Sequence, residues 1–261
     1  MKAKKSLGQN FLMHAQIANR IVHTAQVSRE DVVVEVGPGT GMLTKELLAT
    51  GATVVAIEAD RDLIPVLSET FRDALLSKQL TLIEGDVRTT PLLPYVQAGA
   101  YKVVANIPYY ITGEIIRLFL SHPLPPKSMT LLVQKEVAIR VAREKKESLL
   151  SLSVKTYGTP TYAFTVSRGA FVPKPKVDSA VLHIEHVKNP FGSSDEAERF
   201  FAMLHAGFAH KRKFVLNNLS SVAGSDALTQ AFSELHLSPK SRAEDFTLST
   251  WRALFEVLRK H

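Results

Sequence analysis

The sequence predicts an α/β fold: a doubly wound, Rossmann-like parallel sheet followed by a small all-helical C-terminal domain. Three observations support this prediction. Short apolar, β-branched runs alternate with amphipathic stretches from residue 31 onward, the first run ends in a glycine-rich turn, and helical periodicity without strands continues after residue 194. Strands and helices that alternate at this spacing are typical of a parallel sheet covered by helices on both faces.

The predicted strands are short and strongly apolar. Asp31–Val36 is rich in valine and ends at a glycine, which is typical of a strand buried on both faces of a parallel sheet. Two later segments, Tyr162–Val166 and Ser179–His186, flank Phe171–Val177 and are expected to form an antiparallel edge hairpin. The other predicted strands are Thr53–Ile57, Leu80–Ile83, Tyr101–Ala105 and Met129–Val133.

The predicted helices follow these strands in turn. Met42–Thr50 has helical spacing and is closed by Gly51, and Thr112–Leu120 stops before Pro123. The other helices expected beside the sheet are Arg61–Leu76, Lys135–Arg143 and Ser148–Tyr157.

A linker is expected at Asn189–Ser194, which combines Pro, Gly and Ser. We therefore expect one domain at residues 1–188, with 1–30 as its N-terminal segment, and a second at 189–261. The helices predicted in the second domain are Glu196–Phe208, Lys211–Ser220, Asp226–Leu235 and Thr250–Lys260.

The composition excludes several kinds of chemistry. The 261 residues include no cysteine, which excludes disulfides, thiolate zinc sites, iron–sulfur clusters and cysteine nucleophiles. The nine histidines show no spacing typical of metal ligands, and no Gly-x-Ser-x-Gly motif is present. We expect neither a metal site nor a serine triad.

The charge and hydropathy pattern bears on partners and location. No apolar run approaches the ~20 residues that span a bilayer, and the basic start of the chain is not followed by the apolar stretch of a secretory signal. We expect a cytoplasmic monomer with no membrane partner. The net charge of +7, from 32 Lys and Arg against 25 Asp and Glu, suits a polyanionic partner such as nucleic acid.

A glycine-rich turn, Glu35–Gly41, joins the first predicted strand to the first predicted helix. Gly37, Gly39 and Gly41 let the backbone turn tightly and approach a ligand closely at a helix N-terminus. A dinucleotide fold requires G-x-G-x-x-G, and position 42 is Met, so the pyrophosphate interpretation is disfavoured. The turn suits a ligand without phosphate, such as S-adenosylmethionine.

Two acidic residues end the next two predicted strands. Glu58 ends the second strand, where a carboxylate can accept both ribose hydroxyls of a nucleoside. Asp86 ends the third, where the amino group or ring edge of an adenine would lie. Because the carboxyl ends of parallel strands meet at one edge of the sheet, Glu35, Glu58 and Asp86 together predict a cofactor site there.

The tetrapeptide Asn106-Ile107-Pro108-Tyr109 follows the fourth predicted strand at the same edge. An adenine amine is a poor nucleophile, and two acceptors that take its N–H bonds can orient it. The Asn106 amide oxygen and a backbone carbonyl at Ile107 or Pro108 are candidates, and proline makes the direction of that carbonyl predictable. Tyr109 offers a flat surface for a base taken out of its stack. This turn therefore predicts methylation of an adenine amine, with rate supplied by alignment and electrostatics.

With these motifs in order, the sequence resembles the small-subunit ribosomal RNA adenine N6,N6-dimethyltransferases. That family implies a class I S-adenosylmethionine-dependent methyltransferase sheet and dimethylation of two adjacent adenosines near the 3′ end of that RNA. The resemblance covers nearly the whole chain. Its motifs are Lys4–Leu12, Glu35–Gly41, Glu58, Gly85-Asp86, Asn106–Tyr109, Phe171–Ser179, Arg212-Lys213, Leu216–Leu219 and Ser241–Glu244.

The resemblance also implies roles that the spacing of residues does not. It places Asn10 and Leu12 on the cofactor, and it places Phe171 on the target adenine opposite Tyr109. The partner it implies is small-subunit rRNA within a pre-30S-like ribosomal particle. Phosphate contacts are expected from basic residues. The candidates are Lys4, Lys5, Arg140, Lys174, Lys176, Lys211, Arg212 and Lys213.

Other functions share parts of this pattern. The sister family that methylates a large-subunit rRNA adenine and confers antibiotic resistance has the same glycine turn and Asn-Ile-Pro-Tyr turn. The segments Val177–Ser179 and Arg212–Leu219 favour the small-subunit enzymes. A DNA adenine methyltransferase and a ribosome assembly checkpoint factor with little catalysis remain alternatives, and a dehydrogenase is a distant one.

Overall fold

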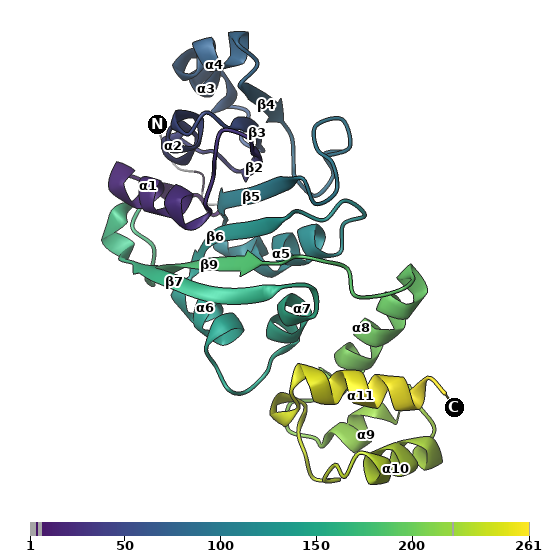
Figure 1. The fold of residues 1–261 in the computed structure, drawn as a ribbon. Helices are drawn as coiled ribbons and strands as arrows, with labels where there is room; N and C mark the ends of the chain where they lie inside the picture. The colour runs from purple at the N-terminus through teal and green to yellow at the C-terminus, as the bar shows by residue number, and fades with distance from the viewer. Residues whose placement is uncertain (1–3, 5–6, 221, 261) are drawn as a thin grey trace.

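The computed structural model describes residues 4, 7–220 and 222–260. A seven-stranded sheet forms the centre of the larger part, and a group of helices lies beyond its β7 edge (Figure 1). The strand order is β4-β3-β2-β5-β6-β9-β7. The strands are β2 (Val32–Val36), β3 (Thr53–Glu58), β4 (Leu80–Glu84), β5 (Tyr101–Asn106), β6 (Ser128–Gln134), β7 (Thr159–Val166) and β9 (Ser179–Glu185).

The parallel part of the sheet confirms the predicted doubly wound fold. Strand β2 pairs in parallel with both β3 and β5, so Val32 lies beside Thr53 on one side and beside Tyr101 on the other. The chain runs outward to β4 from this point and then returns to β5, which makes the β2–β5 junction the topological switch point. Ligands of open α/β sheets bind at such a point, outside the carboxyl ends of the strands.

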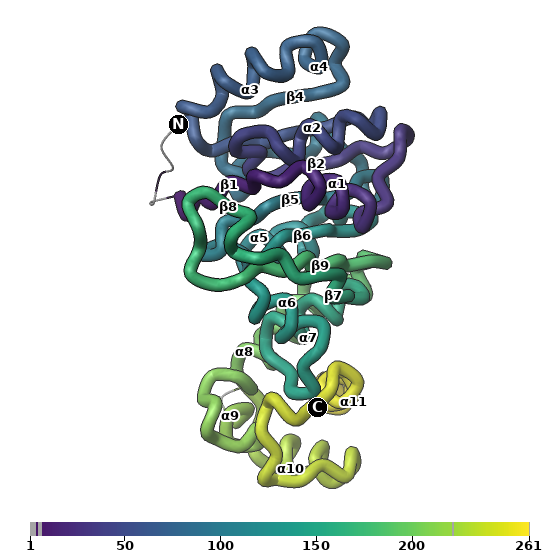
Figure 2. The backbone as a smooth tube through the Cα atoms, turned by 90° about the vertical axis from the view of Figure 1, so that its left-hand side faces the viewer, coloured from purple at the N-terminus to yellow at the C-terminus, as the bar shows by residue number. Residues whose placement is uncertain are grey.

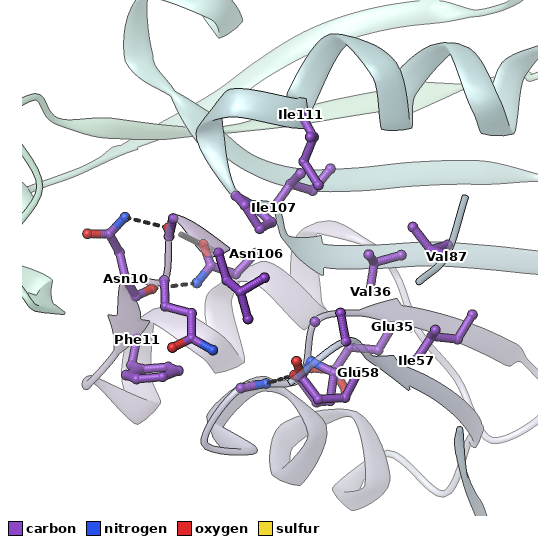
Figure 3. Close-up of a pocket in the computed structure, with 18 of the residues that line it drawn as sticks. Asn10, Phe11, Glu35, Val36, Ile57, Glu58, Val87, Asn106, Ile107 and Ile111 are labelled. Atoms are coloured by element: carbon purple, nitrogen blue, oxygen red, sulfur yellow. Dashed lines mark hydrogen bonds between the residues drawn. The ribbon is translucent and has the colours of Figure 1, made fainter. Parts of the chain in front are cut away.

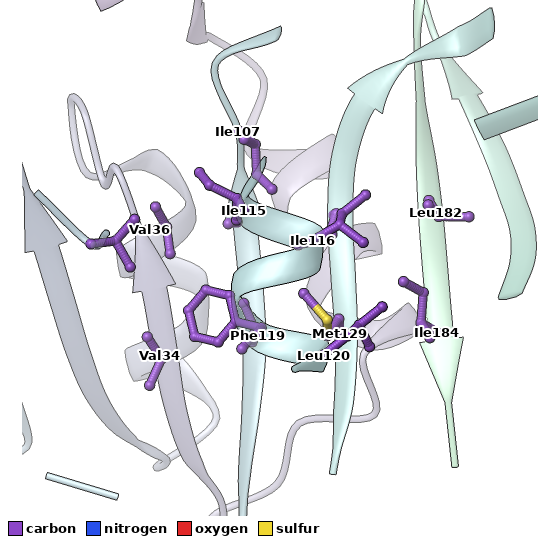
Figure 4. Close-up of a cluster of buried hydrophobic side chains, with 14 of the residues drawn as sticks. Val34, Val36, Ile107, Ile115, Ile116, Phe119, Leu120, Met129, Leu182 and Ile184 are labelled. Carbon is purple, nitrogen blue, oxygen red and sulfur yellow. The ribbon is translucent and has the colours of Figure 1, made fainter. Parts of the chain in front are cut away.

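Helices cover both faces of the sheet, and the residues of each strand alternate between them. Val34 and Val36 belong to the core cluster that includes α6, α7 and α5, the last of which Figure 4 shows beside them, whereas Val33 packs with α1, α2 and α3 on the other face. This alternation follows from the two-residue period of a strand. The helices beside the sheet are α1 (Ala15–Thr24), α2 (Met42–Ala49), α3 (Ile64–Thr70), α4 (Arg72–Leu76), α5 (Thr112–Leu120), α6 (Lys135–Ala142) and α7 (Leu149–Tyr157).

Three details differ from the sequence prediction. The predicted helix Arg61–Leu76 is two helices, because Phe71 leaves the helical region at φ −112° and ψ 28°. The predicted hairpin exists, since β9 pairs antiparallel with β7, but β9 also pairs antiparallel with β6, so of the two hairpin strands β7 alone is an edge strand. The helix α1 was not predicted.

A second, two-stranded sheet was not predicted either. It joins β1 (Phe11–Leu12) to β8 (Phe171–Val172), and Figure 2 shows these two distant segments side by side. Its strands have two residues each, which is too short for any period to be visible in the sequence. The pairing anchors the N-terminal segment close to the carboxyl edge of the large sheet.

The C-terminal part is helical, as predicted, and has its own apolar core around Phe200, Leu204 and Trp251. Leu152 of α7 belongs to the same cluster, so this part packs directly on the larger one. The predicted helix Lys211–Ser220 is regular only from Val215, and Lys211–Lys213 lie in the preceding turn. The helices are α8 (Ser194–Phe208), α9 (Val215–Leu219), α10 (Ser225–Glu234) and α11 (Leu248–Leu258). Within the described residues, no helix has the length and apolar character needed to cross a membrane.

Candidate functional site

A cavity lies at the carboxyl edge of the sheet, where the predicted motifs come together (Figure 3). Its walls come from the N-terminal segment, the turn after β2, and the ends of β3, β4 and β5. Most of the residues predicted to bind a cofactor line it. These are Asn10, Leu12, Glu35, Gly37, Gly39, Glu58, Asp86 and Asn106, joined by Pro108 and Tyr109.

The glycine turn presents bare backbone to this cavity. Gly37 and Gly39 have φ values of 67° and 60°, a region that favours glycine. Apart from the adjoining residues, no described part of the chain comes within 4 Å of the place where a Cβ of Gly37 would be, so the backbone there is open to a ligand. Gly41 does not line the cavity. It begins α2 at φ 82°, and a Cβ on it would lie 2.5 Å from Phe71, so its role is to let α2 pack closely on that ring.

Glu58 is held by backbone groups at the end of β3. Its Oε2 accepts a hydrogen bond from the Gly39 amide at 3.0 Å, and its Oε1 accepts one from the Asp60 amide at 2.8 Å. The side chain is buried, and this burial raises the pKa of Glu58 above its ordinary value. These bonds hold the carboxylate in place at the cavity wall.

Glu35 lies deeper in the same cavity. It is 1% exposed, and no hydrogen bond to its Oε2 is found among the described residues. Burial raises the pKa of Glu35 to about 8, with a further contribution from the nearby Glu58. Two buried carboxyl groups beside a glycine turn oppose a phosphate and favour a ligand that carries positive charge. The residues therefore fit S-adenosylmethionine, which has a sulfonium and an ammonium group.

Asp86 reaches the cavity in company with a residue that was not predicted. Arg88 contacts it through Nη2 at 2.5 Å, and these hydrogen bonds lower the pKa of Asp86. Arg88 also lies 3.4 Å from Glu114 and lines the cavity itself. The apolar residues Ile57, Val87 and Ile111 complete the walls (Figure 3). Arg88 and these three apolar residues were not predicted as site residues. The sequence signal for them was their position next to polar residues at the ends of strands and turns.

The Asn106–Tyr109 turn is fixed at both ends. The Asn106 amide nitrogen donates to the Asn10 carbonyl at 3.0 Å, which leaves its amide oxygen as an acceptor at the cavity. The Tyr109 hydroxyl and the Ser179 hydroxyl lie 2.5 Å apart, and burial raises the pKa of Tyr109. The Pro108 carbonyl accepts from the Ile111 amide at 3.2 Å, so it is already engaged in the turn.

Several predicted site residues lie elsewhere. Phe171 is 2% exposed, packs in the core with Leu12, and is not a wall of the cavity, so its ring offers no surface for a base in this conformation. Lys4 contacts Asp60 and Asp62, which neutralises its charge. Lys5 lies outside the described residues. The remaining RNA candidates are exposed and take part in no salt bridge within the described chain: Arg140, Lys174, Lys176, Lys211, Arg212 and Lys213.

The doubly wound sheet and the cavity at its carboxyl edge define a class I S-adenosylmethionine-dependent methyltransferase. The family model for ribosomal RNA adenine dimethylase matches residues 1–260. The chain belongs to the ribosomal RNA adenine dimethylase family, as the sequence resemblance indicated.

Curated relatives agree with this assignment. The chain is similar to the ribosomal RNA small subunit methyltransferase A of Dehalococcoides mccartyi, with 38% identity over 258 residues that cover 97% of this chain and 88% of the relative. The protein of the same name from Lactococcus lactis is 36% identical over 266 residues, covering 98% and 90% of the two chains.

Two solved structures share the fold over almost the whole chain. A dimethyladenosine transferase from Plasmodium falciparum has a TM-score of 0.78 and 26% identity, with coverage of 96% of this chain and 98% of that one. The 23S rRNA methyltransferase ErmE has a TM-score of 0.75 and 25% identity, with coverage of 96% and 100%. The sequence identity to the small-subunit relatives is higher, and they match this chain at 36–39%.

Proposed function

We propose that this protein transfers methyl groups from S-adenosylmethionine to the N6 amines of two adjacent adenosines near the 3′ end of small-subunit rRNA. The observation that carries the proposal is the position of Asn106, which lines the cavity and whose side-chain nitrogen donates to the Asn10 carbonyl, so that its side-chain oxygen remains as an acceptor. The names of the curated relatives, at 38% identity for one of them, support the small-subunit substrate, whereas the large-subunit methyltransferase ErmE is 25% identical to this chain.

The chain's own residues would orient the amine. When bound, S-adenosylmethionine supplies a methyl group activated by its sulfonium. The Asn106 side-chain oxygen accepts a hydrogen bond from one N–H group of the adenine amine, and the Ile107 carbonyl accepts one from the other. The Ile107 carbonyl is chosen because the Pro108 carbonyl already accepts a hydrogen bond from the Ile111 amide. Tyr109, with its hydroxyl held by Ser179, supports the ring of the base. The amine becomes strongly acidic on methylation and loses its proton to water, so rate comes from alignment and electrostatics.

We assign the cofactor contacts to the residues that line the cavity, from Asn10 and Leu12 at the N-terminal segment to Glu58 and Asp86 at the strand ends. In this proposal, residues 1–188 form the catalytic domain, and residues 189–261 form a helical domain that contacts RNA or the ribosome. The protein acts as a cytoplasmic monomer on a pre-30S-like particle. The unpaired surface cations, which include Arg140, Lys174 and Arg212, are its candidate phosphate contacts.

The test is a methylation assay with tritiated cofactor on unmethylated small ribosomal subunits, followed by nucleoside analysis. We expect dimethyladenosine from the wild type. We expect Asn106→Ala to lower the rate by about 10²–10³-fold, the cost of one lost transition-state hydrogen bond, while RNA binding is retained. The variant Asn19→Ala, at an exposed position on α1 that does not line the cavity, is the matched control and should methylate normally.

Two results would overturn the proposal. Dimethylation by Asn106→Ala at the wild-type rate would show that Asn106 does not orient the amine. Incorporation of label into large subunits, or into duplex DNA, but not into small subunits would show that the substrate is wrong.

A further inference from the structure

The N-terminal segment forms one wall of the cofactor cavity and contacts the glycine turn, Asp60 after β3 and the turn after β5. We call Lys4 together with Leu7–Leu12 the N-terminal strap. Residues Leu7–Leu12 all line the cavity, and the strap ends in β1, which is anchored by its pairing with β8 (Figure 2). The ring of Phe11 lies so close to the glycine turn that a Cβ on Gly39 would be 3.0 Å from it.

The other end of the strap is held by one buried carboxylate. Asp60, 3% exposed, follows β3, and its Oδ1 accepts from Lys4 Nζ at 2.5 Å while its Oδ2 accepts from Gln9 Nε2 at 2.7 Å. Gln9 closes the arrangement, because its Oε1 accepts from the Lys4 amide at 2.7 Å. Burial acts to raise the pKa of Asp60, but the hydrogen bonds from Lys4 and Gln9 lower it overall, so the carboxylate is ionised at neutral pH.

The hydrogen bonds among Lys4, Gln9 and Asp60 lie next to the residues of the proposed cofactor site. The Asp60 amide donates to Glu58 Oε1 at 2.8 Å, so the residue that holds the strap also fixes the expected ribose contact. Further along the strap, the Asn10 carbonyl holds the Asn106 amide. Gly8 lies against Tyr110 so closely that a Cβ there would be 2.9 Å from the ring. A movement of the strap therefore changes both the cofactor contacts and the orientation of Asn106.

We propose that Asp60 is a positioning residue that keeps the N-terminal strap closed over the cofactor cavity and thereby sets the rate of cofactor exchange. The strap forms one wall of the site, so a bound cofactor leaves when the strap moves away. Each methyl transfer consumes one cofactor, and the demethylated product must leave before the next transfer. This inference rests on the part of the proposed function that places S-adenosylmethionine in the cavity, and it does not depend on which RNA is methylated.

The chain offers a closely matched control. Asp62 also pairs with Lys4, at 2.7 Å, but its side chain is 76% exposed and, among the described residues, forms no other ion pair. Asp60→Asn and Asp62→Asn make the same change of charge two residues apart. An exposed ion pair contributes little because water screens it, whereas a buried, doubly bonded carboxylate contributes more.

The experiment measures the dissociation of S-adenosylhomocysteine from the full-length protein, by rapid mixing with excess unlabelled S-adenosylmethionine. We expect Asp60→Asn to raise the dissociation rate about tenfold, as for the loss of a hydrogen bond to a charged group, and Asp62→Asn to change it by less than about twofold. Hydrogen exchange at the amides of residues 8–12 should be faster in Asp60→Asn as well. Equal dissociation rates for the two variants would overturn the proposal.

If Asp60→Asn does not fold, variants of Lys4, the ion-pair partner of Asp60, test the same proposal. Lys4→Gln should raise the dissociation rate, and Lys4→Arg should restore it towards the wild-type value, because the ion pair is kept. A merely structural contribution would not depend on the charge at position 4. An unchanged dissociation rate in Lys4→Gln would contradict the proposal. These readouts need no RNA, so a failure to methylate small subunits would leave them interpretable.

Discussion

Glu35 combines two properties that rarely occur together in one side chain: an ionisable carboxyl group and almost complete burial. Its Oε2 has no hydrogen-bond partner in the described chain, and Glu58 lies nearby with a second carboxyl group. Burial favours the neutral form, which explains why the pKa rises to about 8. At neutral pH, much of Glu35 is therefore protonated when no cation occupies the cavity.

This property predicts a pH-dependent stability. The folded state holds a proton on Glu35 up to about pH 8, whereas the unfolded chain releases it near the ordinary value of 4.5. The folded state thus binds more protons in this window, and the free energy of unfolding falls as the pH rises from about 4.5 to 8. The full loss is on the order of 5 kcal/mol, at about 1.4 kcal/mol for each pKa unit.

Glu35→Gln keeps the shape and removes the titration, so its stability should vary much less over the same range. Urea unfolding of the cofactor-free protein at several pH values between 5 and 8 measures this. Parallel curves for the wild type and Glu35→Gln would mean that Glu35 is not the group responsible.

At the scale of elements, the start of α2 determines how the glycine turn faces the cavity. The turn must end where the helix begins, and Gly41 makes this possible at φ 82°. The same residue lets Phe71, between α3 and α4, pack against the helix start. The third glycine of the motif therefore serves the contact between neighbouring helices, whereas Gly37 and Gly39 line the cavity.

Gly41→Ala should lower the free energy of unfolding by about 3 kcal/mol, because a left-handed alanine costs about 1–2 kcal/mol and the crowding against Phe71 costs about as much again. Gly99→Ala is the control. Gly99 also has a positive φ, 66°, but no atom lies within 4 Å of its Cβ position, so only the backbone cost of about 1 kcal/mol applies. Equal losses in urea unfolding would show that contact with Phe71 is unimportant.

At the scale of the whole molecule, the helical part is attached through a shared core and not only through the segment before α8. Leu152 of α7 is fully buried among residues of the C-terminal cluster, and Tyr157 of the same helix stacks on Phe201 of α8. The exposed Lys and Arg side chains of the two parts therefore keep fixed positions relative to one another. This arrangement suits a protein that contacts several phosphates of a structured RNA.

Leu152→Ala should therefore destabilise the protein by about 2–5 kcal/mol, the usual cost of a buried leucine. Leu93→Ala removes the same atoms from a side chain that is 73% exposed, and it should change the stability by less than about 0.5 kcal/mol. Denaturant unfolding measures both. If the two variants lost stability equally, Leu152 would not join the two parts.

Much of the site was predictable because it depends on strand ends. Glu58, Asp86 and Asn106 each follow an apolar run, and parallel strands bring their carboxyl ends to one edge whatever the helices do. The cofactor class could therefore be inferred from residue types and spacing, and the RNA substrate from the resemblance of the motifs to a known family.

Contacts between distant segments were decided only by the tertiary structure. Lys4 meets Asp60 across 56 positions and Asn106 meets Asn10 across 96, and no local period in the chain encodes such pairs. Arg88 at the cavity, Phe171 in the core and Gly41 against Phe71 were likewise assigned by packing. The sequence by itself determined the doubly wound sheet and the edge where the chemistry lies, because both follow from local periodicity and strand direction. The tertiary structure decided which side chains reach that edge, because burial and pairing depend on neighbours that are remote in the chain.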